Sequence, residues 1–187
     1  MAALAACNST SKEAENNNGT DTVFVSFTNR YAMASLPLSF KGCDQQPLQF
    51  KATDLGTYHR FLSEDAGLLS YCTFKANGNY IAVITLAEAD CLVPVLSTYT
   101  KDGKKIDEKE ISIGSCGPDC DFTCSEYMII NSDYSIYTSD TITYRQCDSL
   151  NEPIRATREH YVLYRTGRLL PTGKIELTKE TKLMLKD

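Results

Sequence analysis

The stretch Leu69–Ala87, LSYCTFKANGNYIAVITLA, decides the fold of this chain. It holds two short runs of β-branched and aromatic residues on either side of Asn77-Gly78. Asn-Gly is the strongest short signal for a hairpin, because both residues tolerate the positive φ of a type I′ turn. The second run, Ile81–Leu86, is apolar on both faces, which predicts a central strand.

Similar short runs and turns follow along most of the chain. Further turn signals stand at Asp102-Gly103, Asn131–Asp133 and Pro171–Gly173. The pattern predicts an all-β fold, an antiparallel meander that forms either a lipocalin-like barrel or a two-sheet sandwich. We expect at most one short helix, between Ala52 and Leu69. The expected strands are 22–27, 48–52, 69–75, 80–86, 92–100, 105–113, 126–131, 135–146, 159–166 and 174–178.

Composition narrows the class of protein. The 187 residues carry a formal net charge of -5, which disfavours a nucleic-acid partner because such proteins need a basic surface. No apolar stretch approaches the roughly 18 residues that a spanning helix needs. We therefore expect a single β domain over residues 22–187, preceded by a polar segment.

Residues 1–21 are predicted to serve in targeting and membrane anchoring rather than to belong to the folded domain. Leu4-Ala5-Ala6-Cys7 resembles the lipobox of bacterial lipoproteins, and residues 8–21 lack aromatic and branched aliphatic side chains, as a disordered tether does. The resemblance implies lipidation at Cys7 and anchoring in the cell envelope, on the periplasmic side or at the surface of the outer membrane. We expect the charged and apolar parts of the signal peptide to lie upstream.

The chain has eight cysteines, which fits an oxidising compartment better than the cytosol. We expect at least two disulfides among the seven that follow Cys7, with one thiol left over. The preferred bridge joins Cys147 to the segment 116–124, whose C-x3-C-x3-C spacing does not match a structural zinc site. The disulfide candidates are Cys43, Cys72, Cys91, Cys116, Cys120, Cys124 and Cys147.

No catalytic residue, cofactor site or metal site is predicted. The two histidines, His59 and His160, have no G-x-S-x-G nucleophile motif beside them, and no phosphate-binding loop is present. The tyrosines of the second half are the candidate binding residues, because tyrosine gives contact area with little loss of entropy. We select Tyr127, Tyr137 and Tyr144, together with the cysteine-rich loop Gly114–Ser125.

These observations predict a non-enzymatic, lipid-anchored envelope protein that binds a protein or a small ligand. One alternative is a periplasmic inhibitor or immunity-type protein that blocks a hydrolase with the loop Gly114–Ser125. A second alternative is a hydrolase whose carboxylates and tyrosines converge in a cleft.

Overall fold

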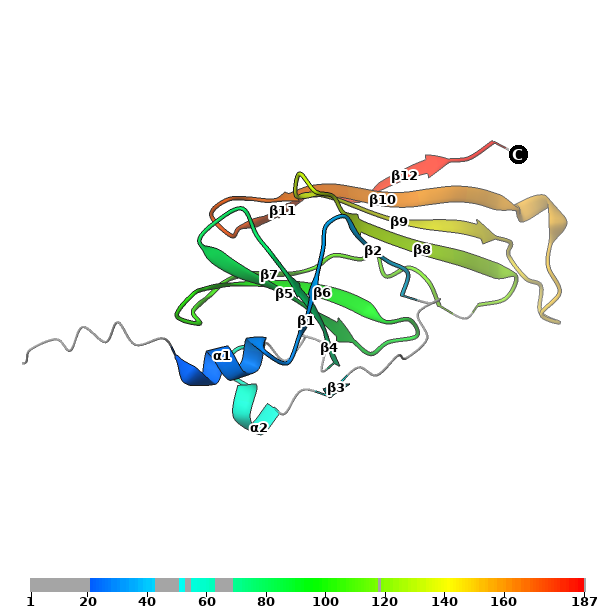
Figure 1. Ribbon diagram of the computed structural model, residues 1–187. Helices are drawn as coiled ribbons and strands as arrows, with labels where there is room; N and C mark the ends of the chain where they lie inside the picture. The colour runs from blue at the N-terminus through cyan, green and yellow to red at the C-terminus, as the bar shows by residue number, and fades with distance from the viewer. Residues whose placement is uncertain (1–20, 43–50, 53–54, 63–68, 118, 187) are drawn as a thin grey trace, which may run out of the picture.

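The molecule consists of two β-sheets packed face to face, with two short helices against the outer face of one of them (Figure 1). The computed structural model describes residues 21–42, 51–52, 55–62, 69–117 and 119–186. Each sheet has six strands, and the described strands do not close into a barrel. The two-sheet sandwich predicted from the sequence is confirmed, and the lipocalin-like barrel is wrong.

Sheet A contains most strands of the first half of the chain. Its strands run in the order β1-β4-β5-β6-β7, and β3 also pairs with β4. β5 lies in the middle, as its apolar sequence predicts. The strands are β1 (Ala32–Ala34), β3 (Lys51–Ala52), β4 (Leu69–Phe74), β5 (Tyr80–Ala87), β6 (Val93–Thr100) and β7 (Lys105–Glu110).

Sheet B contains the second half and one early strand. Its order is β2-β8-β9-β10-β11, and β12 pairs with β10. β9 and β10 are its longest strands, with 10 and 11 residues. The strands are β2 (Leu38–Phe40), β8 (Phe122–Ile130), β9 (Ser135–Tyr144), β10 (Glu159–Leu169), β11 (Ile175–Leu177) and β12 (Thr181–Met184).

The segment between β7 and β8 explains why the meander gives a sandwich. Consecutive antiparallel strands form β4–β7 in one sheet and β8–β11 in the other. β7 does not pair with β8, because residues 111–121 carry the chain across to the second sheet. The eight expected strands from 69–75 onward therefore all form. The expected strand 48–52 is described only at β3, and the sequence missed β1, β2 and β12.

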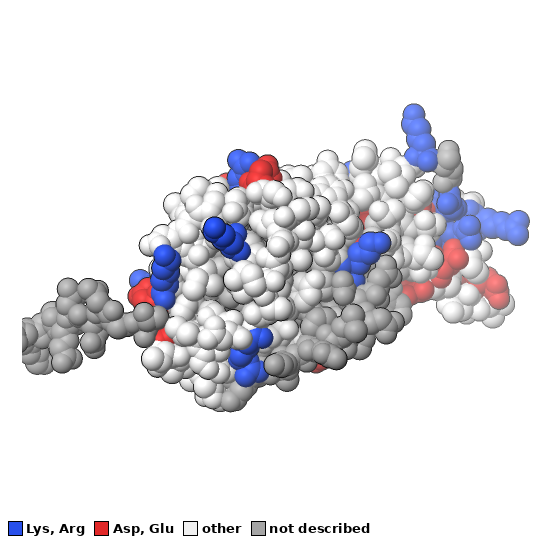
Figure 2. Space-filling model, viewed as in Figure 1, with Lys and Arg blue, Asp and Glu red and all other residues white. Residues whose placement is uncertain are grey.

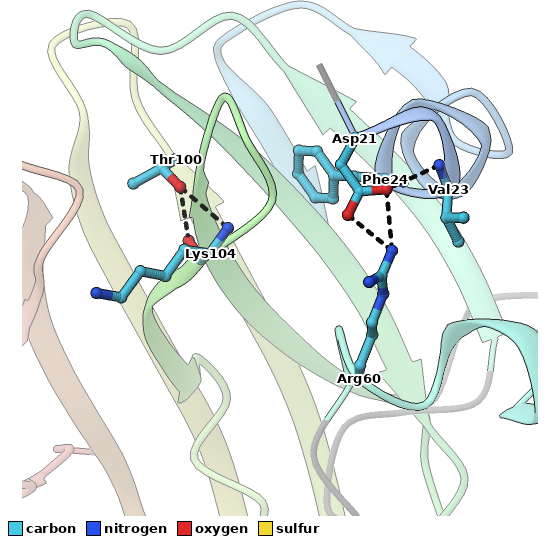
Figure 3. A network of polar contacts seen from close by, with 6 residues as sticks. All are labelled: Asp21, Val23, Phe24, Arg60, Thr100 and Lys104. Atoms are coloured by element: carbon cyan, nitrogen blue, oxygen red, sulfur yellow. Dashed lines mark hydrogen bonds and ion pairs between the residues drawn. The ribbon is translucent and has the colours of Figure 1, made fainter. Parts of the chain in front are cut away.

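Residues 22–27, expected as a strand, instead form helix α1 (Thr22–Thr28). The carboxylate of Asp21 caps this helix by accepting hydrogen bonds from the backbone N–H groups of Val23 and Phe24 (Figure 3). The same carboxylate forms an ion pair with Arg60, at 2.7 Å, just after helix α2 (Leu55–Tyr58). Two α-helices thus replace the single one expected, and a 3₁₀ turn follows at Arg155–Thr157.

Two hydrophobic cores explain why β5 is apolar on both faces. The main core lies between the sheets and includes Ile84, Leu96 and Ile136. The second core lies between sheet A and the helices, where Val83 packs with aromatic rings of which Phe27 is fully buried. No helix among the described residues is long and apolar enough to cross a membrane.

The turns follow the sequence signals with one change of type. Gly103 and Gly173 have positive φ in the turns after β6 and β10, and Tyr134 does so in the turn after β8. The Asn77-Gly78 hairpin forms, but residues 75–79 make a longer connection in which neither Asn77 nor Gly78 has positive φ. The predicted type I′ turn is therefore wrong, although the hairpin itself is confirmed.

Candidate interaction surface

A row of three tyrosines crosses the outer face of sheet B. Tyr127 of β8, Tyr137 of β9 and Tyr164 of β10 have ring centroids 6.5 and 6.2 Å apart. The row forms because Tyr127 and Tyr164 both pair in register with Ser139, two residues from Tyr137 on the same face. All three side chains are half-buried.

The face around this row carries a single charged side chain over three long strands. Cross-strand register places fourteen residues of β8, β9 and β10 on this face, and Arg168, near the end of β10, is the one Lys, Arg, Asp or Glu among them. No described helix or strand packs on it (Figure 1). The fourteen residues are Thr123, Ser125, Tyr127, Ile129, Ser135, Tyr137, Ser139, Thr141, Thr143, His160, Val162, Tyr164, Thr166 and Arg168. We call this surface the tyrosine face.

Tyr144, the third tyrosine selected from the sequence, lies on the opposite face of sheet B. Along β9 the buried residues Ile136 and Ile142 share its parity, and its ring packs against Phe122 at 6.4 Å. The structure therefore brings Tyr127 and Tyr137 together and leaves Tyr144 apart. Tyr164 takes its place, a residue that only the pairing of β9 with β10 could have identified.

The first part of the cysteine-rich loop Gly114–Ser125 contacts the inner side of sheet B, and residues 122–125 belong to strand β8 itself. The backbone N–H of Ser115 donates to the Asp140 carboxylate at 2.8 Å, and Arg165 donates to the carbonyl oxygen of Ser112. Asp140 is an inward-facing residue of β9, with 1 % of its surface exposed. The loop is therefore divided: Ser115 lies against the inner side of sheet B, whereas Thr123 and Ser125, at the start of β8, share the outer face with Tyr127 and Tyr137.

Two disulfides hold this loop. Cys116 is bonded to Cys124, and Cys120 is bonded to Cys147 across 27 positions of the sequence. The second bond is the predicted bridge from Cys147 to the segment 116–124, which is therefore confirmed. Cys91 is also disulfide-bonded.

Cys72 was a disulfide candidate and is a free thiol. It points into the main core from β4 with 4 % of its surface exposed, and burial raises its pKa to about 12. A buried, protonated thiol is unreactive. Cys7 and Cys43 lie outside the described residues.

The sulfur atoms of Cys116 and Cys124 lie within 4.8 Å of an Asp140 carboxylate oxygen. This spacing would suit a metal ion if both cysteines were thiolates. In the structure the two sulfurs are bonded to each other, so neither is available as a thiolate ligand.

Two buried carboxylates face each other across β8 and β9. Glu126 and Asp140 are paired in register and are 7 % and 1 % exposed. Burial raises the pKa of Asp140 to about 6. The cavity beside them measures about 10 Å³, which is room for about one water molecule. This pair could not be predicted from the sequence, because the cross-strand register of β8 and β9 brings the two residues together.

Comparison of the chain with protein-family models, curated proteins and solved structures gives no match. Sandwich folds support many unrelated functions, so the fold alone carries no assignment. Function has to follow from the surfaces described above.

Proposed function

We propose that this protein is a non-enzymatic, lipid-anchored envelope domain that binds a protein partner through the tyrosine face. The observation that carries the proposal is the scarcity of charge on that face around the row of Tyr127, Tyr137 and Tyr164, since Arg168 near the end of β10 is its one charged residue. The centres of protein interfaces are depleted in charged residues and enriched in tyrosine. In a chain with 23% charged residues, thirteen uncharged positions out of fourteen on one uncovered face are a strong bias.

The shape of the face favours a protein over a small molecule. Small ligands are bound in concave sites, whereas the tyrosine face is one side of an uncovered sheet. Backbone ladders on both sides of β9 fix the positions of the tyrosines before binding. Little conformational entropy is therefore lost when a partner contacts them.

The membrane anchor and the compartment are supported by the cysteines. Leu4-Ala5-Ala6-Cys7 resembles a lipobox, and the polar segment after it fits a tether. Disulfides such as Cys120–Cys147 persist in oxidising compartments, of which the periplasm is one. We therefore propose lipidation at Cys7, with the β domain held at the periplasmic side or the surface of the outer membrane.

The binding test compares two variants of the full chain in capture from an envelope extract. Tyr137→Ala with Tyr164→Ala removes two adjacent rings of the tyrosine face. Tyr144→Ala is the matched control, since it removes the same side chain on the other side of β9. We expect protein partners, identified by mass spectrometry, to be lost with the double variant and kept with the control.

Equal capture by both variants would contradict the tyrosine face as the binding surface. Turnover of any substrate by the purified domain would contradict the non-enzymatic part of the proposal. The anchor is tested separately by expressing the chain with its full signal peptide. Mass spectrometry should then find an acylated Cys7, and Cys7→Ser should release the protein from membranes.

A second candidate function is inhibition of a hydrolase by the loop Gly114–Ser125. It is favoured by the two disulfides and the bond from Ser115 to Asp140, which together make the loop rigid. Here Asp119→Arg, at an exposed position of the loop, should relieve inhibition of a captured hydrolase. The tyrosine variants should leave that inhibition unchanged.

A further inference from the structure

A groove of about 760 Å³ lies where the end of α1, strand β1 and the β4–β5 hairpin meet. Its lining is largely apolar and aromatic, including Tyr31, Met33, Phe74 and Ile81. The volume falls within the range of about 300–1,000 Å³ that small-molecule sites occupy. The groove belongs to sheet A and shares no residue with the tyrosine face of sheet B.

The described lining of the groove carries a single charge, and it is positive. Lys75, an exposed residue just after β4, is the only Lys, Arg, Asp or Glu among the described lining residues. Figure 2 shows the same tendency over the face of β1 and β4, where isolated basic side chains stand on an otherwise uncharged surface and acidic ones lie toward its margins. An anionic group is therefore attracted to this groove, and a cationic one is repelled.

Two further lining residues have side-chain groups that a ligand could contact. Met33, on the edge strand β1, exposes 73 % of its surface. Tyr80 is 5 % exposed, and its buried hydroxyl has no hydrogen-bond partner among the described residues. Burial raises the pKa of Tyr80 to about 12, so the hydroxyl keeps its proton and is a donor at neutral pH.

We propose that this groove binds a single-chain amphiphile with an anionic headgroup, of the fatty-acid type. The alkyl chain lies along Met33, Tyr31 and Ile81, and the carboxylate pairs with Lys75. Tyr80, whose hydroxyl has no partner among the described residues, lines the same groove. This small-ligand site is additional to the protein-binding surface proposed above.

The probe is dodecanoate below its micellar concentration, measured by calorimetry with the full chain. We expect saturable binding with one site per molecule. Lys75→Gln should weaken binding at least tenfold, and Lys101→Gln, at an exposed lysine outside the groove, should leave it unchanged. Met33→Glu should weaken binding further because it places a negative charge in the groove. Val25→Glu is its control, since Val25 is an exposed apolar residue of α1 outside the lining.

Three additional ligands distinguish the proposed occupant from others. Dodecyl maltoside tests the headgroup charge, dodecyltrimethylammonium reverses it, and phosphatidylglycerol vesicles test a membrane surface. The proposal is overturned by the absence of saturable dodecanoate binding to folded protein, by equal binding of the cation, or by binding to vesicles alone. It is also overturned if Lys75→Gln and Met33→Glu both bind as the unmodified chain does. None of these outcomes bears on partner capture by the tyrosine face.

Discussion

Sheet A and sheet B differ in how many of their faces are covered. Sheet A lies between sheet B and the helices, so Val83 and Ile84, neighbours on β5 that point to opposite sides, are both 0 % exposed. Sheet B is covered only on its inner side, so Tyr137 and Thr141 on β9 remain half-buried. We infer that sheet A contributes most of the stability of the fold, and that sheet B provides a surface for contact with a partner.

The two sheets also differ in their cross-links. Both disulfides whose two partners are described join the loop after β7 to sheet B or to the segment that follows β9. Sheet A carries the free thiol of Cys72 within its core, and its β5–β6 connection holds the disulfide-bonded Cys91. The end of sheet B that holds the loop is fixed by covalent bonds, whereas the centre of sheet A is fixed by burial.

The largest difference in stability between variants of the two sheets should come from removing one aromatic ring from the outer side of each sheet. Phe27, on the helix that covers sheet A, is fully buried and contacts five other rings. Phe27→Ala should lower the free energy of unfolding by about 3–5 kcal/mol. Tyr137→Ala on sheet B should cost about 1 kcal/mol or less. Urea unfolding measures the loss of stability in each variant. Equal losses would contradict the inference that sheet A contributes most of the stability.

Removing the disulfides should weaken the end of sheet B by amounts set by loop length. The double variant Cys120→Ser with Cys147→Ser opens a loop of 27 positions and should lower the free energy of unfolding by about 3.5 kcal/mol. Opening the 8-position loop of Cys116 and Cys124 should cost about 2.5 kcal/mol. Thermal unfolding under non-reducing conditions tests the order. Cys72→Ala is the control and should not change the sensitivity of the fold to reductant.

The buried carboxyl of Asp140 should make stability depend on pH. Its pKa is about 6 in the folded chain, raised by burial above an ordinary value of 3.8. The folded state therefore holds the proton more tightly than the unfolded state. The resulting stability is fully present below about pH 4 and is lost as pH rises through about 6, by on the order of 2 kcal/mol.

Asp140→Asn should remove this dependence and stabilise the protein above pH 7, because the amide oxygen can still accept from Ser115. Unfolding experiments at pH 4 to 8 measure the effect. An unchanged slope between pH 4 and 7 in the variant would assign the dependence to another group. Glu126, the other buried carboxylate beside it, is then the next to replace.

The smallest expected difference in stability comes from the same substitution, valine to alanine, made on the outer face of each sheet. Val83→Ala removes two methyl groups beneath the helices and should lower the free energy of unfolding by about 2 kcal/mol. Val162→Ala removes them from the uncovered face of sheet B and should cost about 0.5 kcal/mol or less. If Val162→Ala costs as much, an unrecognised element covers the tyrosine face.

Much of the fold could be predicted because its signals are local. The apolar run of β5 and the turn residues around Gly103 and Gly173 specify hairpins without any knowledge of distant residues. The strand predicted for residues 22–27 is wrong because that prediction depended on their β-branched residues, which favour strands. The helix wins there because Asp21 caps it and because Phe24 and Phe27, three residues apart, share the face that packs on sheet A.

Strands β1, β2 and β12 were missed for a different reason. Each has only three or four residues, too few for an alternating pattern to stand out. The choice between barrel and sandwich also depended on a distant event, the crossing of residues 111–121 between sheets. No local pattern in those residues specifies which sheet the chain joins next.

The candidate site could be predicted only in part. Tyr127 and Tyr137 belong to one hairpin, so their proximity follows from its turn. Tyr144 could have been set aside, because seven residues separate it from Tyr137 and an odd separation places side chains on opposite faces of a strand. Tyr164 depends on the register of β10, and the Lys75 groove depends on how α1 packs. Neither relation is written in neighbouring residues.

The two disulfides overlap along the chain, since Cys120 lies between Cys116 and Cys124 and pairs with Cys147 beyond them. A single backbone cut anywhere from Cys116 to Cys147 is therefore always bridged by at least one of the two bonds. A protease that nicks the loop or the turn between β8 and β9 would release no fragment. Nicked and intact molecules would migrate together on a gel until a reductant separates the pieces.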